Sequence, residues 1–329
     1  MAKQPNQKLK ILYILQLLQK KSDENHPISV AAILEELERY DISAERKSIY
    51  SDIEQLRQFG FDIEMNHSRT SGGYYLASRD FELAELKILV DSIQASKFIT
   101  TNKTRALIKK LSNLCSDDQA KQLKHEVHVM DRVKTGNENI FYNVDAINEA
   151  LIKKVMIRFS YFSWNEKGEF VLKNSKQKYE VTPLGLTFQN ENYYLIAYHH
   201  DKKEKRHYRV DKMKNIEVTN INKISSDEIG EFDLVKYSNE NFGMYAGEVE
   251  TVHLKLKKSL IGIVIDRFGT DISIRELDEE YCDVRVTVAI SGQFFGWLAG
   301  IGENICIFSP DKIRNQYIDY LNEIIEKHK

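Results

Sequence analysis

The stretch that decides the fold of the N-terminal region is "ERKSIYSDIEQL", residues 45–56. Its apolar residues Ile49, Ile53 and Leu56 recur at the spacing of one face of an α-helix, which predicts that this face packs against a core. A helix this short is not stable alone in water, so it needs neighbouring elements. Its opposite, polar side is then either an ordinary solvated surface or a surface that binds a partner.

The composition of the whole chain indicates a globular protein of two or three domains. The chain has 329 residues, of which 42% are hydrophobic and 29% are charged, and these proportions argue against extensive disorder. Its net charge is −2, so a basic surface for nucleic acid must be local rather than global.

The three cysteines and the N-terminus predict a cytoplasmic protein. Cys115, Cys282 and Cys306 lie far apart and form no metal-ligand pattern, so we expect buried thiols in a reducing compartment. The first residues, MAKQPNQKLK, contain no signal-peptide apolar region. No apolar run approaches the roughly 20 residues that span a bilayer, and we expect no membrane partner.

The residues around the opening stretch predict three helices followed by a hairpin. The apolar pattern marks a first helix over residues 8–19, and Ser29 and Ser43 are expected to cap the second and third. Residues 61–65 and 74–76 alternate as strands do, and the turn-rich sequence "NHSRTSGG" separates them. This order within residues 1–78 is typical of a winged helix-turn-helix.

A winged helix-turn-helix would use the opening helix to contact DNA. The second helix of such a pair lies in the major groove, with its N-terminal residues at the base edges. Glu45 and Asp52 oppose this function because phosphates repel carboxylates, although Asp52 would be harmless if it bonded within the domain. The residues that we expect to contact DNA are Arg46, Lys47, Tyr50 and Ser51 on the helix and Arg69 at the tip of the wing.

The same segments resemble the winged helix-turn-helix of bacterial regulators of the DeoR-like group. Their recognition helix often runs close to Arg-Lys-Thr-Ile-Tyr-x-Asp-Ile-x-x-Leu, and their wing ends in Gly-Gly-Tyr-x-Leu. Ser48 stands here in place of the threonine. The matching residues are Arg46, Lys47, Ile49, Tyr50, Asp52, Ile53, Leu56, Gly72, Gly73, Tyr74 and Leu76.

The rest of the chain predicts a helical connector over residues 79–138, a domain of short strands over residues 139–225, and a mixed region over residues 245–329. The fold class is therefore a multidomain α+β protein. It comprises a winged helix-turn-helix, a helical connector, a small strongly curved sheet or barrel, and a C-terminal α+β domain.

The strand-rich region resembles a WYL domain, which is named for a Trp-Tyr-Leu strand. That strand is Tyr193-Tyr194-Leu195 in this chain, so a tyrosine replaces the tryptophan. The upstream sequence "TPLGL" and the downstream sequence "RHYRVDKM" also match, with Lys212 in the place of an arginine. The sequence "GWLAGIGENICIFSP", residues 296–310, resembles the C-terminal extension of WYL proteins.

The resemblance implies an Sm/SH3-like β-barrel that acts as a sensor of a nucleotide or oligonucleotide effector. Arginines suit phosphate, tyrosines offer surfaces for base stacking, and histidines such as His199 and His207 add pH-dependent donors. Two purely structural alternatives remain open: each tyrosine packs in the core as its only role, and Arg206 and Arg209 form ion pairs with nearby carboxylates. The residues expected to bind the ligand are Tyr161, Tyr193, His199, Arg206, Tyr208 and Arg209.

The sequence offers little support for an enzyme. His199, His200 and His207 flank a charged turn, but they lack a recognised ligand spacing, so we expect no metal. "GIG" at residues 300–302 lacks the third glycine of a dinucleotide loop, and we expect no cofactor and no catalysis.

We therefore predict a cytoplasmic bacterial transcription regulator, a repressor or an activator, that binds a double-stranded DNA operator as a homodimer. Its WYL domain would bind the effector, and the C-terminal domain would contribute to dimerisation or to the effector site. Two alternatives stay open: a nucleic-acid-sensing or interaction module that does not act in transcription, and a nuclease.

Overall fold

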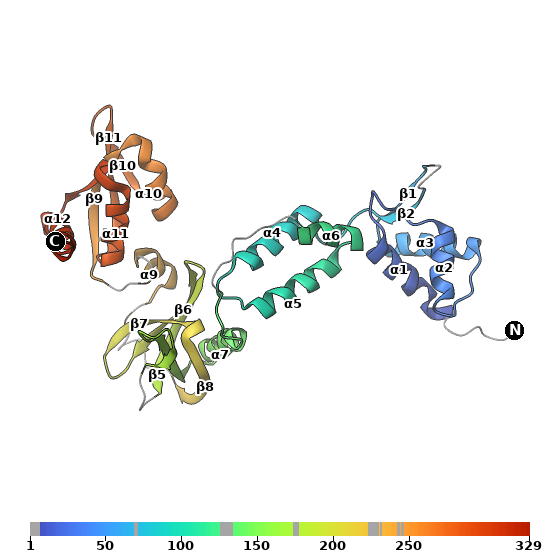
Figure 1. Cartoon of the computed structure of the whole chain (residues 1–329), viewed down its shortest axis with the longest axis horizontal. Helices are drawn as coiled ribbons and strands as arrows, with labels where there is room; N and C mark the ends of the chain where they lie inside the picture. The colour runs from blue at the N-terminus through green and yellow to red at the C-terminus, as the bar shows by residue number, and fades with distance from the viewer. Residues whose placement is uncertain are drawn as a thin grey trace. The chain divides into compact units, whose positions relative to one another are not determined.

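The structure is a computed structural model of the chain. It describes residues 7–68, 72–125, 134–173, 178–222, 230, 232–241, 244 and 247–329. The chain divides into two compact units, residues 1–136 and residues 137–329. Figure 1 shows the order of the helices and strands in each unit.

The first unit begins with the three helices and the hairpin that the sequence predicts. A 3₁₀ turn, η1, precedes them, and the elements are η1 (Gln7–Leu9), α1 (Lys10–Lys21), α2 (Val30–Glu38), α3 (Arg46–Phe59), β1 (Ile63–Asn66) and β2 (Gly73–Leu76). The strands pair antiparallel. One apolar core joins all five major elements, and its fully buried members include Ile14, Leu18, Ile33, Leu37, Ile49 and Ile53.

One of the two predicted helix caps is confirmed. The Ser29 hydroxyl accepts a hydrogen bond from the Ala32 amide at the start of α2. The prediction for Ser43 is wrong, because α3 begins at Arg46 with Glu45 at its N-cap position. The Glu45 side chain makes no capping hydrogen bond, and the Glu45 carbonyl accepts the first bonds of the helix, from the Ser48 and Ile49 amides.

Three further helices complete the described part of the first unit. They are α4 (Leu83–Ala95), α5 (Thr101–Leu111) and α6 (Asp117–His125), with a 3₁₀ turn, η2 (Ser112–Leu114), between the last two. A small core formed by Leu86, Cys115, Ala120 and Leu123 holds α4 against α6. The Lys134 ammonium donates to the Ser96 carbonyl at the end of α4 and to the Thr104 hydroxyl on α5.

Polar contacts join the N-terminal helices to the chain that follows the hairpin. The carboxylate of Asp23, just after α1, accepts a bond from the Ser116 hydroxyl, which also caps α6. The guanidinium of Arg79 donates to the carbonyls of Gln19 and Ser22, 2.7 Å each, at the end of α1. These contacts connect the two parts of the unit through charged and hydroxyl groups whose partners are fixed.

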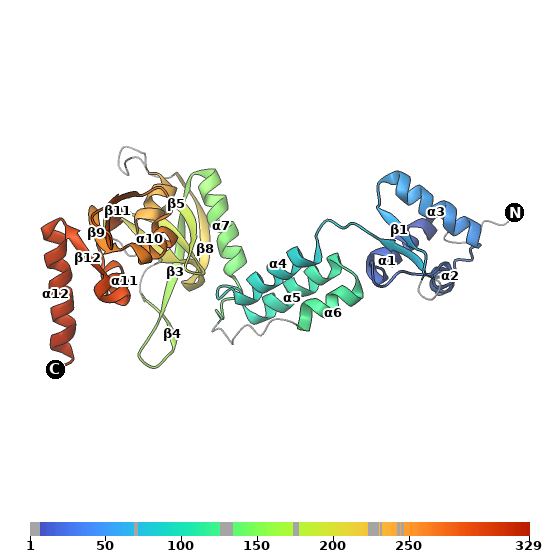
Figure 2. The same ribbon diagram turned by 90° about the horizontal axis from the view of Figure 1, so that it is seen from above.

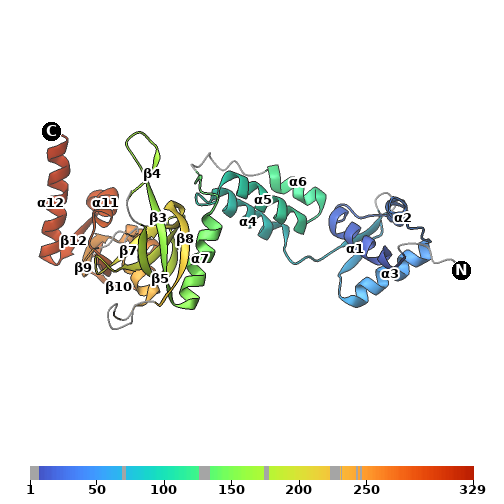
Figure 3. The ribbon, with the colours of Figure 1, turned by 90° about the horizontal axis from the view of Figure 1, so that it is seen from below.

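The second unit begins with a helix and a curled antiparallel sheet. The elements are α7 (Ile140–Lys153), β3 (Val155–Trp164), β4 (Phe170–Leu172), β5 (Tyr179–Gln189), β6 (Asn192–His199), β7 (Glu204–Arg209), η3 (Val210–Lys212) and β8 (Met213–Asn222). The main strand order is β8-β3-β5-β6-β7, and β4 pairs with the far end of β3. Among the described strands, β7 and β8 end this five-stranded order without pairing with each other, so the sheet forms a half-barrel. Figure 3 shows the β3–β4 hairpin extending beyond it.

Helix α7 lies along the half-barrel beside β8 (Figure 2). Its Ile147 and Ala150 are completely buried, and the Asn143 amide donates to the carbonyls of Val210 and Met213. The helix therefore covers the sheet through an apolar face and is aligned by one asparagine. In the middle of β6, Leu195 and Ile196 point to opposite faces of the strand, yet both are fully buried.

A short helix and a second sheet complete the chain. The elements are α9 (Leu234–Glu240), β9 (Val249–Lys257), η5 (Lys258–Leu260), α10 (Ile261–Phe268), β10 (Ser273–Glu276), β11 (Tyr281–Ala289), α11 (Gly292–Ile301), η6 (Gly302–Asn304), β12 (Ile305–Ser309) and α12 (Asp311–Lys327). The antiparallel strand order is β10-β11-β9-β12, and one face of this sheet packs against α10, α11 and α12.

The structure also bears on the burial of the cysteines and on membrane-spanning helices. Cys115 and Cys282 are buried as predicted, but Cys306 is exposed because it alternates on β12 with the buried Ile305 and Ile307. Among the described helices, none combines the length and the apolar character that crossing a bilayer requires.

Candidate functional site

Helix α3 has the two-sided character that its sequence predicts. Ile49, Ile53 and Leu56 are buried in the core of the N-terminal helices. On the other side, Arg46, Lys47, Tyr50 and Ser51 are exposed. Neither Arg46 nor Lys47 forms a hydrogen bond or an ion pair with any residue that the structure describes. The first two turns of α3 thus present two cations and two hydroxyl groups to solvent.

The carboxylate that opposes DNA binding in the sequence turns inward in the structure. Asp52 lies 2.9 Å from the Lys10 ammonium, and both side chains are nearly buried, at 13% and 12% exposed. The same ammonium donates to the Ser48 hydroxyl. This contact ties α3 to α1 and removes one negative charge from the exposed side of α3. Glu45, in contrast, stays exposed.

The hairpin that follows α3 is held by a third segment of chain. The Ile28 amide donates to the Tyr74 carbonyl, and the Tyr74 amide donates to the Ile28 carbonyl, at 2.8 Å each. Gly73 makes this approach possible, because a β-carbon there would lie 2.4 Å from the backbone carbon and oxygen of Ile28. Arg69, predicted at the tip of the hairpin, lies outside the described residues.

The half-barrel contains a cluster of aromatic rings. Tyr179 stacks on Phe159 with a centroid distance of 5.6 Å, and the ring of Tyr208 meets that of Tyr161 edge to face at 5.4 Å. Burial raises the pKa of the Tyr161 phenol to about 12 and also raises the pKa of the Tyr208 phenol. Tyr208 is only 4% exposed, so it contributes mainly to the interior of the cluster.

A cavity of about 350 Å³ opens beside this cluster. Its lining consists of Arg158, Lys178, Tyr179, Glu180, His199, His200 and Asp201. The Nδ1 atom of His199 is buried and has no hydrogen-bond partner among the described residues. Burial, together with the positive charge of Arg206, lowers the pKa of the His199 imidazole. The cavity therefore combines an aromatic wall, a neutral imidazole and two cations that are themselves paired with carboxylates, Arg158 with Glu180 and Lys178 with Glu217.

The two arginines predicted to bind the ligand are both paired with carboxylates. The Arg209 guanidinium bonds to both oxygens of Asp211, at 3.0 and 2.9 Å, and to the Asn192 side chain at 2.8 Å. The Arg206 guanidinium bonds to Glu204 at 2.6 Å. An anionic ligand would have to displace these carboxylates or bind to the remaining donors.

The remaining predicted residues have separate surroundings. Tyr193 packs on Phe188 with a centroid distance of 5.0 Å. His207 Nδ1 lies 2.6 Å from the Met244 carbonyl oxygen, which can only accept, so Nδ1 carries the proton. Its Nε2 therefore accepts from the Tyr237 hydroxyl at 3.0 Å in the neutral ring. The structure thus brings Tyr161, Tyr208, His199 and Arg206 together, but not the histidines as a metal-binding set.

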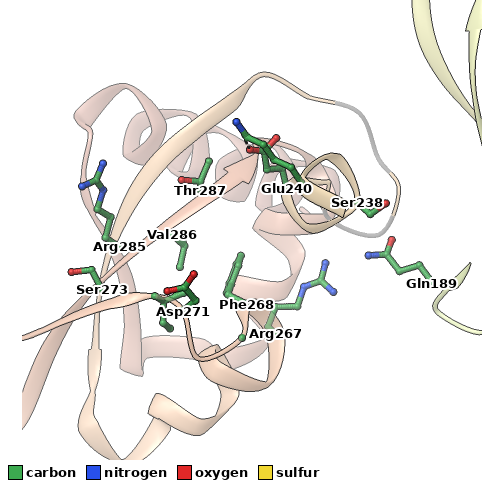
Figure 4. A pocket seen from close by; sticks show the side chains of 13 residues that line it. Gln189, Ser238, Glu240, Arg267, Phe268, Asp271, Ser273, Arg285, Val286 and Thr287 are labelled. Carbon is green, nitrogen blue, oxygen red and sulfur yellow. Dashed lines mark ion pairs between the residues drawn. The ribbon is translucent and has the colours of Figure 1, made fainter. Parts of the chain in front are cut away.

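A larger cavity, of about 630 Å³, lies where α9 meets the C-terminal sheet (Figure 4). Its lining includes Arg267 and Phe268 from α10, Ser238 and Glu240 from α9, and Arg285 from β11. The Ser238 hydroxyl is buried without a hydrogen-bond partner among the described residues. Burial lowers the pKa of Arg267. These groups could hold a polar ligand.

The sequence did not single out this cavity or Tyr179. Tyr179 is the register partner of Phe159 across β5 and β3, and this pairing brings its ring into the cluster. The only signal in the sequence was the alternation of "KYEVT" just before the "TPLGL" motif. The cavity has no signal of its own, because its lining residues come from four separate segments.

The solved structures that match the chain include two distant neighbours. One is proteasome accessory factor B/C (PafBC) of Arthrobacter aurescens, with 17% identity and a TM-score of 0.28, covering 95% of this chain and 48% of that one. The other is a CRISPR Cas-related protein, with 14% identity and a TM-score of 0.37, covering 97% and 84% of the two chains. The chain therefore spans about half the length of PafBC. No curated protein sequence matches the chain.

Two protein-family models match the second unit. The WYL domain model matches residues 142–218, which include α7 and the half-barrel. The WCX domain model matches residues 248–325, which include the second sheet and its three helices. The predicted WYL domain and its C-terminal extension are confirmed: the chain contains a WYL domain followed by a WCX domain.

Proposed function

We propose that this protein is a DNA-binding transcription regulator whose N-terminal region forms a winged helix-turn-helix. Helix α3 would enter the major groove, where Arg46 and Lys47 contact base edges and Tyr50 and Ser51 contact bases or phosphates. The hairpin of β1 and β2 would act as the wing. The observation that carries the proposal is the exposed first turn of α3, with unpaired Arg46 and Lys47 opposite a fully packed face.

We further propose that the WYL domain binds a nucleotide or oligonucleotide in the cavity beside Tyr179. A base would stack on the tyrosine, while Arg158 and Lys178 would attract the phosphates. His199 offers an unpartnered ring nitrogen at the same place. Arg206 would contribute once the phosphate displaced Glu204. The effector would change operator affinity only to the extent that it favours one arrangement of the protein over another.

The working form that we propose is a homodimer that binds without catalysis. Two copies would contact half-sites separated by about 34 Å, one turn of the duplex, or a multiple of it, and both contacts would add to specificity. The WCX domain would contribute to this dimer or to the effector site. We propose that the protein binds DNA in the cytoplasm and that it has no enzymatic activity, no metal and no cofactor.

A mobility-shift assay on the DNA upstream of the protein's own gene tests the first proposal. Arg46→Ala and Lys47→Ala are each expected to weaken specific binding by about 1–3 kcal/mol, which is the cost of losing a base contact. Lys153→Ala is the matched control, because this exposed lysine pairs with Glu149 in the other unit. Specific binding that is unchanged in both α3 variants would contradict the placement of the recognition helix.

One observation favours a second candidate, a nucleic-acid-sensing module that does not act in transcription. Residues 1–78 contain 10 lysines and arginines but 11 aspartates and glutamates, so this region has no positive excess to attract DNA. In that case the exposed side of α3 would bind a protein instead. Absence of any binding to duplex DNA by the intact protein, with ligand binding retained by the WYL domain, would favour this candidate.

A further inference from the structure

The first unit contains a strongly basic segment outside the recognition helix. Residues 92–116 include Lys97, Lys103, Arg105, Lys109 and Lys110 but no aspartate or glutamate. The chain as a whole has 47 basic and 49 acidic residues, so this segment departs sharply from the average. Four of the five cations lie on α5.

Helix α5 directs all four of its cations to solvent. Its buried side is centred on Thr104, which is 7% exposed, and this side faces α4. Lys103 and Lys110 are two turns apart and lie on one flank of the exposed face, while Arg105 and Lys109 are one turn apart on the other flank. With 11 residues the helix is about 16 Å long, enough to contact several phosphates of a duplex.

Three of the four cations of α5 are not neutralised by their surroundings. Within the part of the chain that the structure describes, Arg105, Lys109 and Lys110 form no ion pair. Several cations of the N-terminal helices are different, because they pair with carboxylates: Arg39 pairs with Glu35 and Glu36. The paired cations also include Lys10, Lys21 and Arg57, which pair with Asp52, Glu36 and Glu54.

Because of these ion pairs, the described N-terminal helices have few unpaired cations that could contact phosphates. A protein that makes about 6–10 phosphate contacts binds duplex DNA with a strong dependence on salt, whereas α3 offers only Arg46 and Lys47 as cations unpaired within the described residues of each copy. Further cations of the same unit would add phosphate contacts to those of α3. Helix α5 supplies four exposed cations, more than any other described helix of this unit presents without compensating carboxylates in its own sequence.

We propose that the exposed basic face of α5 binds the phosphate backbone of the DNA duplex that α3 contacts. The inference rests on the proposed function of α3 and adds to it a second, sequence-independent contact. Duplex DNA is the occupant that fits, because a row of cations without carboxylates complements a continuous row of phosphates. The surface would raise affinity for every sequence equally and would leave the choice of operator to Arg46 and Lys47.

The test compares salt dependence of duplex binding by the full-length protein and two double variants. These are Arg105→Gln with Lys109→Gln, and Lys103→Gln with Lys110→Gln; glutamine keeps the helix propensity close to that of lysine. The probes are the upstream DNA and a shuffled duplex of the same length. Each lost phosphate contact lowers the slope of log K against log salt by about 0.9, so each double variant is expected to lose about 1.8 on both probes.

The control is Lys121→Gln with Lys153→Gln, which removes the same charge from exposed, carboxylate-paired lysines on α6 and α7. Its slope is expected to equal that of the wild type, and circular dichroism verifies that every variant is folded. If the α5 variants match this control while Arg46→Ala still weakens upstream DNA, the α5 inference is wrong and α5 faces another partner, such as an acidic protein. If the wild type binds neither probe, both proposals are wrong. A loss on the upstream DNA alone would also refute a sequence-independent role for α5.

Discussion

Replacing Gly73 by alanine tests whether the close approach of Ile28 to the hairpin holds the wing in place. The added β-carbon would lie 2.4 Å from the carbon and the oxygen of the Ile28 carbonyl and 2.8 Å from the Ser29 nitrogen. Real β-carbons do not approach backbone atoms this closely. Since both partners are backbone, no side chain can rotate away to make room, and the hairpin must separate from Ile28.

The expected cost is about 3 kcal/mol. Separation breaks the two backbone hydrogen bonds between Ile28 and Tyr74, 2.8 Å each, at about 1 kcal/mol net per bond. Displacing the buried side chains of Tyr74 and Leu76 adds roughly 1 kcal/mol, at the lower end of the cost of overpacking a core. A domain whose free energy of unfolding is about 5–15 kcal/mol stays folded when it loses this amount.

Hydrogen exchange followed by mass spectrometry measures this effect locally. The amides of Ile28 and Tyr74 are expected to exchange about 100-fold faster in Gly73→Ala, because 3 kcal/mol is about two factors of ten. The matched control is Gly262→Ala on α10, where a β-carbon meets nothing within 4 Å and where alanine favours the helix. Exchange at Ile28 and Tyr74 as slow as in the wild type would refute the argument.

Three further outcomes follow from contacts in the structure. Lys10→Ala leaves the nearly buried Asp52 carboxylate without its cation and is expected to destabilise α3 by about 3 kcal/mol, measured by hydrogen exchange in α1 and α3. Burial lowers the pKa of His207 below its ordinary value of 6.5. The stability that the neutral ring contributes is therefore fully present above pH 6.5 and is lost as the pH falls below 6.5. Melting curves of His207→Gln, followed by the fluorescence of Trp164 and Trp297, should depend less on pH than those of the wild type. Tyr161→Phe removes the acceptor of the Arg209 amide and should cost about 1 kcal/mol in a denaturant titration; an unchanged midpoint would contradict this.

The helices and strands were predictable because they depend on local patterns. The spacing of Ile49, Ile53 and Leu56 was enough to identify α3 and its buried face. Ser29 caps its helix as its position predicts, because a serine directly before an apolar periodic segment is a local signal. The prediction for Ser43 was wrong because α3 starts two residues later than that signal would place it, at Arg46, with Glu45 at the N-cap position.

The site was less predictable because it depends on pairings over long distances in the sequence. The ring of Tyr179 reaches Phe159 only through the register of β5 on β3. The ion pairs of Arg206 with Glu204 and of Arg209 with Asp211, in contrast, join residues two apart, and a spacing of two is visible in the sequence. The cavity around Arg267 joins segments whose proximity no periodicity encodes.

The contacts of Asp23 with Ser116 and of Arg79 with the end of α1 have a mechanical consequence. They make the connection between the N-terminal helices and α4–α6 rigid rather than flexible. A rotation of α6 would then move α1, and through the contact between Lys10 and Asp52 it would also move α3. A rotation of α4–α6 would therefore also reorient α3, and with it the exposed side chains of Arg46 and Lys47.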